Sequence, residues 1–283
     1  MKKQGCSVAL GFFDGVHMAH KEVLCTAVSA NEHSIAVIIN RPGGKKLITQ
    51  SLKQKAILDL GISEIIEFAF DEIKNLSCEE FVIGILKNKL GAQTAVCGCN
   101  FHFGHGGTGD SGVLETFCKR EGIRTYVTPP VIHNGIFVSS TKIRELLSAG
   151  ELKQANELLT RPFSYDFEVA HGEMRGRKMG FPTINQAFES EFFTPKSGVY
   201  ASKVIARSKE YIGVTNIGIR PTFGSTSLLS ETNILDFNGD LYGQKVLVFL
   251  YEYLRPEEKY ESMESLKQQI FKDSQKAKQM LKI

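Results

Sequence analysis

The first half of the chain alternates short apolar runs with longer segments whose apolar residues recur every three to four positions. Short apolar runs bounded by turn residues predict buried strands, and the longer repeat predicts amphipathic helices. The predicted strands are residues 7–10, 34–39, 64–68, 94–97 and 124–127, and the predicted helices are residues 21–30, 52–60, 78–90 and 112–120. This alternation predicts an α/β domain with a parallel sheet that is covered by helices on both faces. Ligands of such sheets bind at the carboxyl ends of the strands.

Two more helices are predicted at residues 140–148 and 151–159, and Gly150 separates them. After Arg161 and Pro162 the pattern changes to β-branched and aromatic runs, with glycine-containing turns between them. The predicted strands there are residues 164–170, 199–205, 211–217, 228–237 and 245–254. They predict an antiparallel sheet closed into a small β-barrel, with a hairpin turn at Asn238-Gly239. A final amphipathic helix is predicted within residues 256–283.

This change of pattern predicts two domains, residues 1–160 and residues 161–283. A chain of 283 residues is long enough for two ordinary domains, and 42% apolar with 23% charged residues is typical of globular proteins. The net charge of +3 comes from 34 basic and 31 acidic residues, which are spread along the chain without a long block of like charges. The sequence therefore gives no support for nucleic-acid binding.

The sequence also bears on location. No apolar stretch reaches the roughly 18 residues that a membrane span needs. We interpret the start of the chain as a buried first strand rather than a signal peptide, because its apolar stretch is short and runs directly into Asp14. All 6 cysteines lie in the first half, which favours a reduced, cytoplasmic protein. Cys97 and Cys99 lack the spacing of a Cys-x-x-Cys pair and are expected to pack in the core.

Two histidines follow the first predicted strand. His17 and His20 stand in the first turn of a predicted helix, so their rings point to one face beside the helix N-terminus. The unpaired backbone N–H groups there favour anions, and two imidazole donors suit the charge that builds on a phosphate during group transfer. The alternative interpretation is a pair of surface histidines without a catalytic role.

A second element with hydroxyl and basic side chains is Val138-Ser-Ser-Thr-Lys-Ile-Arg144. Ser140 and Thr141 offer hydroxyls at a helix start, and Arg144 lies one turn on, a layout that can hold a triphosphate. Taken alone, the segment is also a good helix cap, with Ser139 or Ser140 as the capping residue. Together with His-x-x-His in an alternating α/β domain, it resembles the nucleotidylyltransferase superfamily, whose members transfer a nucleotide from ATP and release pyrophosphate.

Aromatic residues and glycines follow the fourth predicted strand, in Gly98-Cys-Asn-Phe-His-Phe-Gly104 and then Gly109-Asp110. Aromatic rings in such a loop can hold a flat heterocycle, and glycines let the backbone approach it closely. The alternative is a glycine-rich surface turn whose two phenylalanines enter the core. A zinc site is a further alternative, although no acidic or thiol ligand at suitable spacing completes the candidate histidines. Those candidates are His17, His20, His102 and His105.

The second half carries a different set of polar residues. Residues 171–185 are rich in glycine and basic residues and show neither a helical nor a strand period, which predicts a loop over a charged ligand. Thr183 and Asn185 offer oxygen ligands of the type that Mg²⁺ accepts when ATP phosphates complete its shell. Glu231 is a candidate general base for an alcohol that attacks a γ-phosphate. The alternatives are a solvated loop and an exposed strand carboxylate.

Several short motifs, in order along nearly the whole chain, match one family pattern. They are Phe13-Asp-Gly-Val-His17, Ser139-Ser-Thr-Lys-Ile-Arg144, Gly180-Phe-Pro-Thr183 with Asn185, Gly198-Val-Tyr200, Asn216-Ile-Gly218 with Arg220-Pro-Thr-Phe223, and Asp240-Leu-Tyr-Gly243. The chain thereby resembles the bacterial bifunctional riboflavin kinase/FMN adenylyltransferase family, also called FAD synthetase. The resemblance implies an α/β Rossmann-like nucleotidylyltransferase domain followed by a small antiparallel β-barrel domain with a C-terminal helix.

The resemblance also implies two ATP-dependent reactions. The barrel would phosphorylate riboflavin to FMN, with Glu231 as base and with Thr183 and Asn185 at Mg²⁺ and ATP. The first domain would adenylylate FMN to FAD and release pyrophosphate. The implied partners are ATP, riboflavin and FMN, with no nucleic acid and no membrane, and self-association is left open. A riboflavin kinase whose first domain only binds flavin or nucleotide is the alternative function, and a flavin-sensing regulator without turnover is the third.

The resemblance assigns site residues by matching positions. In the first domain, ATP and its phosphates are assigned to Gly11, Phe13, Asp14, Gly15, His17, His20, Ser140, Thr141 and Arg144, and flavin to Asn100, Phe101, His102, Phe103, Gly104 and Asp110. In the second domain, ATP is assigned to Gly172, Arg175, Gly180, Phe181, Pro182 and Asn216.

The chain departs from the family pattern at several places. Ala19 replaces the glycine of His-x-Gly-His, and Ile39-Asn-Arg-Pro-Gly-Gly44 replaces Phe-x-Pro-His-Pro. Asn100-Phe-His-Phe-Gly104 replaces Asp-Phe-Arg-Phe-Gly, which puts histidine in place of the permanently charged arginine. Asn233 stands where histidine is common. At position 19, alanine is harmless in an ordinary helix, whereas a left-handed backbone or a close phosphate approach would need glycine.

Overall fold

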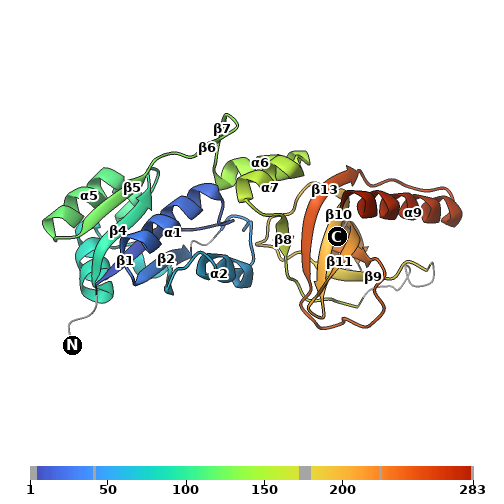
Figure 1. Ribbon diagram of the computed structural model, residues 1–283, viewed down its shortest axis with the longest axis horizontal. Helices are drawn as coiled ribbons and strands as arrows, with labels where there is room; N and C mark the ends of the chain where they lie inside the picture. Colours follow the sequence, from blue (N-terminus) through green and yellow to red (C-terminus); the bar gives the residue numbers. More distant parts are fainter. Residues whose placement is uncertain (1–4, 41–42, 172–179, 223–224, 282–283) are drawn as a thin grey trace. The chain divides into compact units, whose positions relative to one another are not determined.

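The computed structural model describes residues 5–40, 43–171, 180–222 and 225–281 (Figure 1). The chain divides into two compact units, one of Met1–Gly44 with Gln50–Ser140 and one of Lys45–Thr49 with Thr141–Ile283. Residues 141–160, which the sequence pattern assigns to the first domain, therefore pack with the second unit. The domain boundary itself stays a prediction.

The first unit is built on a five-stranded parallel sheet. Its strands are β1 (Cys6–Gly11), β2 (Ser34–Asn40), β3 (Glu64–Ala69), β4 (Ala92–Gly98) and β5 (Arg124–Thr128), in the order β3-β2-β1-β4-β5. All neighbouring pairs in this sheet are parallel. The predicted α/β class is confirmed, and each strand predicted in this half lies within an observed strand.

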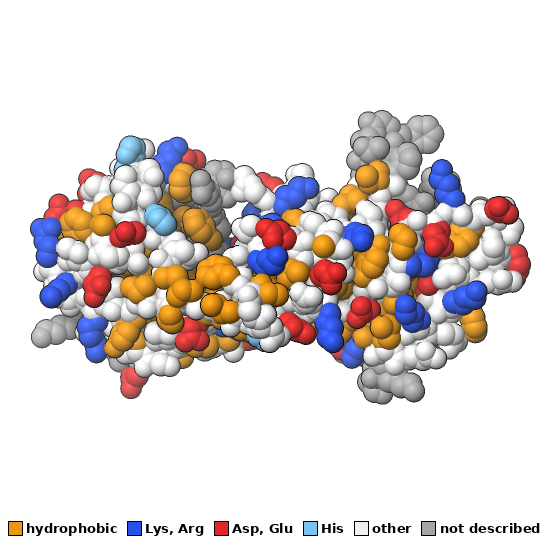
Figure 2. All heavy atoms as spheres, turned by 90° about the horizontal axis from the view of Figure 1, so that it is seen from above, with side chains coloured by type: hydrophobic (Ala, Val, Ile, Leu, Met, Phe, Trp, Pro, Cys, Tyr) orange, Lys and Arg blue, Asp and Glu red, His pale blue; other side chains and the backbone are white. Residues whose placement is uncertain are grey.

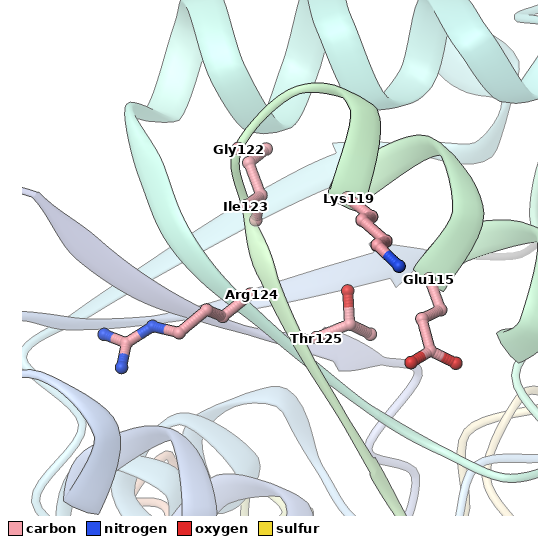
Figure 3. Close-up of a pocket in the computed structure, with 6 residues that line it drawn as sticks. All are labelled: Glu115, Lys119, Gly122, Ile123, Arg124 and Thr125. Atoms are coloured by element: carbon pink, nitrogen blue, oxygen red, sulfur yellow. The ribbon is translucent and has the colours of Figure 1, made fainter.

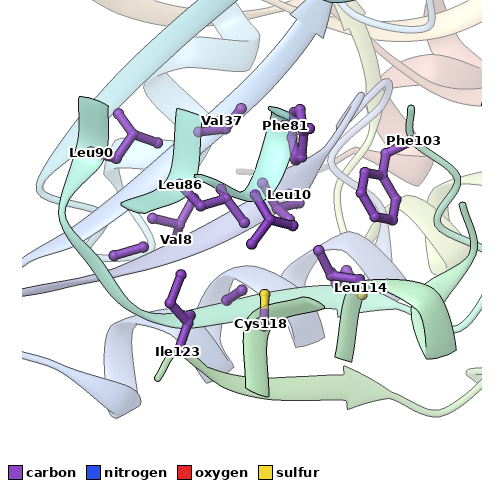
Figure 4. Packing of buried hydrophobic residues seen from close by; sticks show 14 of the residues in the cluster. Val8, Leu10, Val37, Phe81, Leu86, Leu90, Phe103, Leu114, Cys118 and Ile123 are labelled. Carbon is purple, nitrogen blue, oxygen red and sulfur yellow. The ribbon is translucent and has the colours of Figure 1, made fainter. Parts of the chain in front are cut away.

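The central strands of this sheet are buried on both faces. On one face α1 (Met18–Ala30) packs on β1 and β4, and Ser7 of β1 points toward it, because its hydroxyl donates to Ala27 O of that helix. On the other face Val8 and Leu10 of β1 join one large apolar cluster, which includes Leu86 and Leu114 from the covering helices (Figure 4). Because alternate residues meet different helices, β1 is buried on both faces, and Ser7, its one hydroxyl residue, is bonded to the helix that covers it.

The remaining helices of the first unit differ from the prediction mainly in type and number. They are α2 (Gln50–Leu58), α3 (Phe70–Ile73), α4 (Cys78–Glu80), the π-helix η1 (Phe81–Leu90), the 3-10 helix η2 (His105–Gly107) and α5 (Ser111–Arg120). The predicted helix over residues 78–90 is confirmed, although only its first turn is α-helical and the rest is a π-helix. The apolar pattern of so short a segment does not distinguish the hydrogen-bond spacing of an α-helix from that of a π-helix. The short α3 and η2, and the hairpin of β6 (Ile132–His133) with β7 (Ile136–Phe137), are too brief to show a period.

The second unit is built on a six-stranded antiparallel sheet. Its strands are β8 (Phe163–Tyr165), β9 (Thr183–Ala187), β10 (Gly198–Ala206), β11 (Lys209–Thr222), β12 (Ser225–Ile234) and β13 (Leu247–Arg255), in the order β8-β13-β10-β11-β12-β9. Two helices, α6 (Ser140–Ala149) and α7 (Leu152–Leu159), precede the sheet, and α9 (Met263–Met280) follows it. Every pairing within the sheet is antiparallel.

The sheet curls so that the segment after β8 meets the opposite edge strand, β9. The Ala170 N–H donates to Asn185 O (2.8 Å), and Gln186 Nε2 donates to Phe167 O (2.6 Å). Four aromatic rings fill this part of the interior, at centroid distances of 5.0 to 6.5 Å: Tyr165, Phe167, Phe188 and Phe192. The predicted small antiparallel barrel with a C-terminal helix is confirmed.

A chain of hydroxyl groups also crosses the barrel interior. Thr215 of β11 bonds to Ser202 of β10 (2.8 Å) and to Thr232 of β12 (2.9 Å), and the Tyr165 hydroxyl bonds to Ser230 of β12 (2.6 Å). All five side chains are fully buried, so each hydroxyl needs a protein partner. Since side chains alternate along a strand, the residues between these hydroxyls point to the other face of the sheet.

Two expectations about the second unit are wrong. Asn238-Gly239 does not join paired strands, because β10 and β11 separate β12 from β13 in the sheet. The tight hairpin instead joins β10 to β11 through Arg207 and Ser208, whose φ angles are 49° and 61°. Turns of this kind usually carry Asn or Gly, so this one has no sequence signal. Residues 183–185 are not in a loop either, because they begin the edge strand β9, which is held by pairing with β12.

The surface carries mixed charges. On the face shown in Figure 2, basic and acidic side chains are interspersed. Within the described residues, no helix combines the length and the apolar character that crossing a membrane requires. The cysteines are free thiols. Cys97 is buried as expected, and burial raises the pKa of its thiol to about 12, whereas Cys99 is exposed, so the expectation of core packing is wrong for Cys99.

Candidate functional sites

The predicted phosphate residues of the first unit lie at the point where the sheet order reverses. The chain moves outward from β1 to β2 on one side and from β4 to β5 on the other. The carboxyl ends of β1 and β4 therefore lie at the switch point where sheets of this class bind ligands. The segment from Gly11 to His17 follows β1, and the segment from Asn100 to Gly104 follows β4. The topology therefore brings the predicted phosphate motif and the predicted flavin motif to one edge of the sheet.

The turn after β1 has an unusual backbone. Phe13, Gly15 and Val16 have φ angles of 48°, 83° and 41°. Such angles cost free energy in residues with a side chain, and surrounding structure must impose them. Phe13 and Val16 are both buried, at 1% and 0% exposure, so packing holds the turn. A Cβ on Gly11 would lie only 3.0 Å from the Phe13 ring, so glycine there lets that ring fold over the strand end.

His17 and His20 stand together at the start of α1. His17 is the N-cap, and its Nδ1 accepts from the His20 N–H (3.3 Å). Because Nδ1 accepts, the neutral ring carries its proton on Nε2, which is then a donor. The two rings stack with centroids 3.6 Å apart, and the Phe13 ring packs edge-on to His20. The first turn of α1 contains no acidic residue, so two imidazoles and a helix N-terminus form an environment suited to anions.

Ala19 has the backbone of an ordinary helix. It is the second residue of α1 and does not have a positive φ. A left-handed backbone, which would require glycine at this position of His-x-Gly-His, is therefore absent. Asn40, in the other loop that departs from the family, donates through Nδ2 to Glu67 on the neighbouring strand (2.7 Å).

Ser140 is bonded to the turn after β1, within the first unit. Its hydroxyl donates to Asp14 O (2.9 Å). Thr141 is exposed on the next position, and Arg144 donates through Nε and Nη2 to Lys45 O (3.0 and 2.9 Å). Ser140 thus joins the histidine turn, while Thr141 and Arg144 belong to the second unit.

The predicted flavin loop divides into buried and exposed positions. Phe101 and Phe103 are 6% and 5% exposed and belong to the apolar cluster, so their rings pack as the core alternative expects. His102 is exposed, and its Nδ1 donates to Asn100 O (3.0 Å), since a carbonyl can only accept. Gly104 has φ +77°, and a Cβ there would meet Cys78 Sγ at 2.6 Å.

Asp110, also assigned to flavin, caps a helix. Its carboxylate accepts from the Val113 N–H (2.9 Å) at the start of α5. The zinc alternative has no support in the described part of the chain, where no three His, Cys, Asp or Glu side chains come together as a metal site. A pocket of about 340 Å³ lies beside Arg124 and Thr125 at the start of β5 (Figure 3). It is at the amino ends of the strands, opposite the edge that carries the predicted site.

In the second unit, strand pairing aligns the predicted kinase residues. Glu231 on β12 pairs directly with Asn216 on β11 and with Asn185 on β9. Two positions along, Asn233 pairs with Thr183. Directly paired residues and residues two apart share one face, so all five polar side chains lie on the same face of three adjacent strands. It is the face opposite the buried hydroxyl chain.

The loop that precedes β9 is held to this face. Asn233 Nδ2 donates to Pro182 O (2.7 Å), and Gly180 has φ +85°, which favours glycine. Phe181 is partly buried between them. Gly172 and Arg175, also assigned to ATP, lie outside the described residues.

Sequence reasoning gave no role to two aromatic neighbours of this region. The His171 and Tyr242 rings stack at 4.0 Å, which brings the start of the basic segment to Asp240-Leu-Tyr-Gly243. The Tyr242 N–H also donates to Asp240 Oδ1 (2.9 Å). The motif Asp240-Leu-Tyr-Gly243 could have indicated a role for Tyr242. His171 is a single histidine before a loop, and the sequence gives no signal for it.

Comparisons with known proteins cover the same two halves. A family model described as FAD synthetase matches residues 1–142, and one described as riboflavin kinase matches residues 159–281. A Pseudomonas fluorescens protein named bifunctional riboflavin kinase/FMN adenylyltransferase is 34% identical over 285 residues, which cover 95% of this chain and 91% of that protein. The Escherichia coli K12 protein of the same name is 30% identical, with 98% and 93% covered.

One solved structure is similar over nearly the whole chain. It is a crystal structure of a Streptococcus pneumoniae protein described as a macrolide-efflux protein, with a TM-score of 0.89 and 26% identity, and the match covers 98% of this chain and 95% of that one. This likeness concerns the fold of the chain.

Proposed function

The chain belongs to the family of bifunctional riboflavin kinase/FMN adenylyltransferases, and we infer from this that it is a transferase with two ATP-dependent activities. One converts riboflavin and ATP to FMN and ADP, and the other converts FMN and a second ATP to FAD and pyrophosphate. The observation that supports this function is that each unit brings together a group of polar residues suited to phosphates, and that the two groups differ in construction. One is a histidine turn at a helix N-terminus, and the other is a polar face on three strands.

In the kinase reaction, a hydroxyl oxygen of the riboflavin side chain attacks the γ-phosphorus of ATP. Its proton passes to the carboxylate of Glu231, and the bond to the leaving ADP oxygen breaks. Asn216 and Asn185 flank Glu231 in the strand pairing, so their amides can orient the groups around the carboxylate. The loop held by Asn233 brings the Gly180-Phe-Pro segment to the same face.

We propose Mg²⁺ as the divalent ion of the kinase site, held by Thr183 and Asn185 together with ATP phosphates. Thr183 and Asn185 are two residues apart on β9 and point to the face that carries Glu231. Their hydroxyl and amide oxygens are hard, neutral donors, which suit Mg²⁺ when phosphate oxygens supply the negative charge. When bound, the ion would neutralise charge on the transferred phosphate.

In the adenylyl transfer, an oxygen of the FMN phosphate attacks the α-phosphorus of ATP, and pyrophosphate leaves. The proposed role of His17 and His20 is to donate hydrogen bonds to the phosphates at the N-terminus of α1. Ser140 supports the turn through its bond to Asp14 O. No covalent intermediate is needed, because positioning and charge stabilisation supply the catalysis.

The assignment is tested by incubating the chain with riboflavin, ATP and Mg²⁺ and separating the flavins by chromatography. We expect FMN to appear first and FAD afterwards. No FMN would reject the kinase, and FMN without FAD would favour the alternative of a kinase whose first domain only binds its ligand. A parallel incubation with FMN as the starting flavin separates the second step from the first.

A further inference from the structure

Glu257, which follows β13, reaches the polar face of the proposed kinase site. Its Oε1 accepts from Asn216 Nδ2 at 2.9 Å. Asn216 pairs directly with Glu231 on the neighbouring strand. The Glu257 carboxylate is therefore bonded to the residue that lies next to the proposed base. The sequence gives no hint of this contact, because Glu257 stands in a charged stretch and is far from Asn216 along the chain.

Two glycines of the family motifs make room for this approach. A Cβ on Gly218 would lie 2.2 Å from Glu257 Oε1, so any side chain there would displace the carboxylate. Gly198 has φ +146°, and a Cβ on it would lie 2.6 Å from Arg255 O. The chain thus passes close to Gly198 at the end of β13 and then close to Gly218 of β11, which brings Glu257 to Asn216.

The segment that carries Glu257 is also clamped. Arg255 donates to both carboxylate oxygens of Asp273 on α9, with a shortest distance of 2.8 Å, and through Nη1 to Pro256 O (3.0 Å). Gln269 adds a further bond to Asp273 (3.0 Å). Asp273 is 4% exposed, so this clamp is sheltered from water. Through the bond from Arg255 to Pro256 O, these contacts fix the backbone at the residue just before Glu257.

The carboxylate decides which way the Asn216 amide faces. A carboxylate only accepts hydrogen bonds, so the amide must present Nδ2 to Glu257 and turn Oδ1 away from it. Oδ1 is buried from solvent, and among the described residues it has no hydrogen-bond partner. A buried acceptor is costly unless a donor meets it. The amide is therefore held ready for a donor that comes from outside the described chain.

We propose that Glu257 is a positioning residue of the kinase site, which holds the Asn216 carbonyl oxygen ready to accept a hydrogen bond from a substrate beside Glu231. This proposal rests on the proposed kinase function. The donor is a hydroxyl or amino group, and it belongs either to the flavin substrate or to the nucleotide.

The test compares Glu257→Ala with Glu257→Gln in steady-state FMN formation. Glutamine keeps an oxygen that accepts from Nδ2, whereas alanine removes it. We expect Glu257→Ala to raise KM for one substrate about tenfold, the factor that one ordinary hydrogen bond contributes, with little change in kcat. Glu257→Gln should stay within about twofold of the parent. A rise in the riboflavin KM identifies the flavin as donor, and a rise in the ATP KM identifies the nucleotide.

A neighbouring carboxylate supplies the matched control. Glu258 accepts from the Tyr260 hydroxyl (2.9 Å), so Glu258→Ala removes the same kind of side chain one position along. It should leave both KM values unchanged. FAD formation from added FMN should be the same in all these variants, because it uses the other unit. Unchanged KM values in Glu257→Ala, or equal losses in the alanine and glutamine variants, would overturn the proposal.

A measurement without substrate separates this proposal from the kinase function. Hydrogen exchange of the Asn216 side-chain amide, followed by NMR and assigned with Asn216→Ser, should be slow in the parent and in Glu257→Gln but fast in Glu257→Ala. Equal exchange in all three would reject the positioning role even if FMN is formed. A parent chain that makes no FMN would reject the proposed kinase, whatever the amide shows.

Discussion

Asn233 on β12 donates a hydrogen bond to the carbonyl oxygen of Pro182, at 2.7 Å, two residues from Glu231 on the same strand. The strand that carries the proposed base thus also holds the loop that leads to Thr183. Asn233, which stands where the family often has histidine, thus serves here as a donor toward a backbone carbonyl.

Replacing Asn233 by leucine should loosen the loop before β9. One lost hydrogen bond corresponds to about 1–1.5 kcal/mol, or roughly a tenfold fall in kcat/KM for ATP in FMN formation. Steady-state kinetics at saturating riboflavin would measure it, with FAD formation from FMN as the control. An unchanged kcat/KM for ATP would show that this bond does not position the loop.

Replacing Ser140 by alanine should affect the other reaction. Its hydroxyl donates to Asp14 O in the turn that precedes His17. Loss of this bond should lower the rate of FAD formation from FMN several-fold, by about 1 kcal/mol, and leave FMN formation unchanged. Ser148→Ala, an exposed position on the same helix, is the matched control. Equal effects of the two substitutions would contradict a role of Ser140 in the turn.

Thr215→Val should destabilise the barrel. The substitution removes the bonds to Ser202 and Thr232 and leaves both of those buried hydroxyls short of a partner. We expect a loss of about 2 kcal/mol in the free energy of unfolding, measured with urea. Thr116→Val, at an exposed position of α5, should change it by less than about 0.5 kcal/mol. A fully stable Thr215→Val would show that the hydroxyl chain does not hold the strands.

The cysteines should differ sharply in reactivity. Burial raises the pKa of Cys97 to about 12, and burial also raises the pKa of Cys118. A raised pKa means that these thiols stay protonated at pH 8, and the thiolate is the reactive form. Alkylation of the folded protein at pH 8, followed by mass spectrometry of peptides, should label the exposed Cys25 and Cys99 first. Early labelling of Cys97 would contradict the described core.

Much of the fold was predictable because its strands are long enough to show a pattern. The central strands β1, β2 and β4 appear as mostly apolar runs because they are buried on both faces, whereas β5 is mostly exposed. The secondary-structure features that the sequence did not predict depend on tertiary contacts or on hydrogen-bond spacing. β9 is a strand because β12 pairs with it, and Arg207 and Ser208 form a hairpin turn without the usual residues.

The sequence allows candidate site residues to be proposed where residue type and chemistry coincide, as for His17 and Glu231, and their roles stay predictions. Residue type alone is a weaker guide where a suitable side chain has a structural role instead. Phe101 and Phe103 lie in the core, and Asp110 caps a helix. Contacts between distant segments, such as that of Glu257 with Asn216, leave no pattern in a single sequence.

The most direct measurement pairs two variants, Glu231→Gln and His20→Ala, in separate assays of FMN formation from riboflavin and FAD formation from FMN. Two independent catalytic sites predict reciprocal losses. Glu231→Gln should make no FMN yet still convert FMN to FAD, and His20→Ala should make FMN yet no FAD. Retention of FAD formation in a folded His20→Ala, or loss of both activities in either folded variant, would contradict the presence of two separate sites.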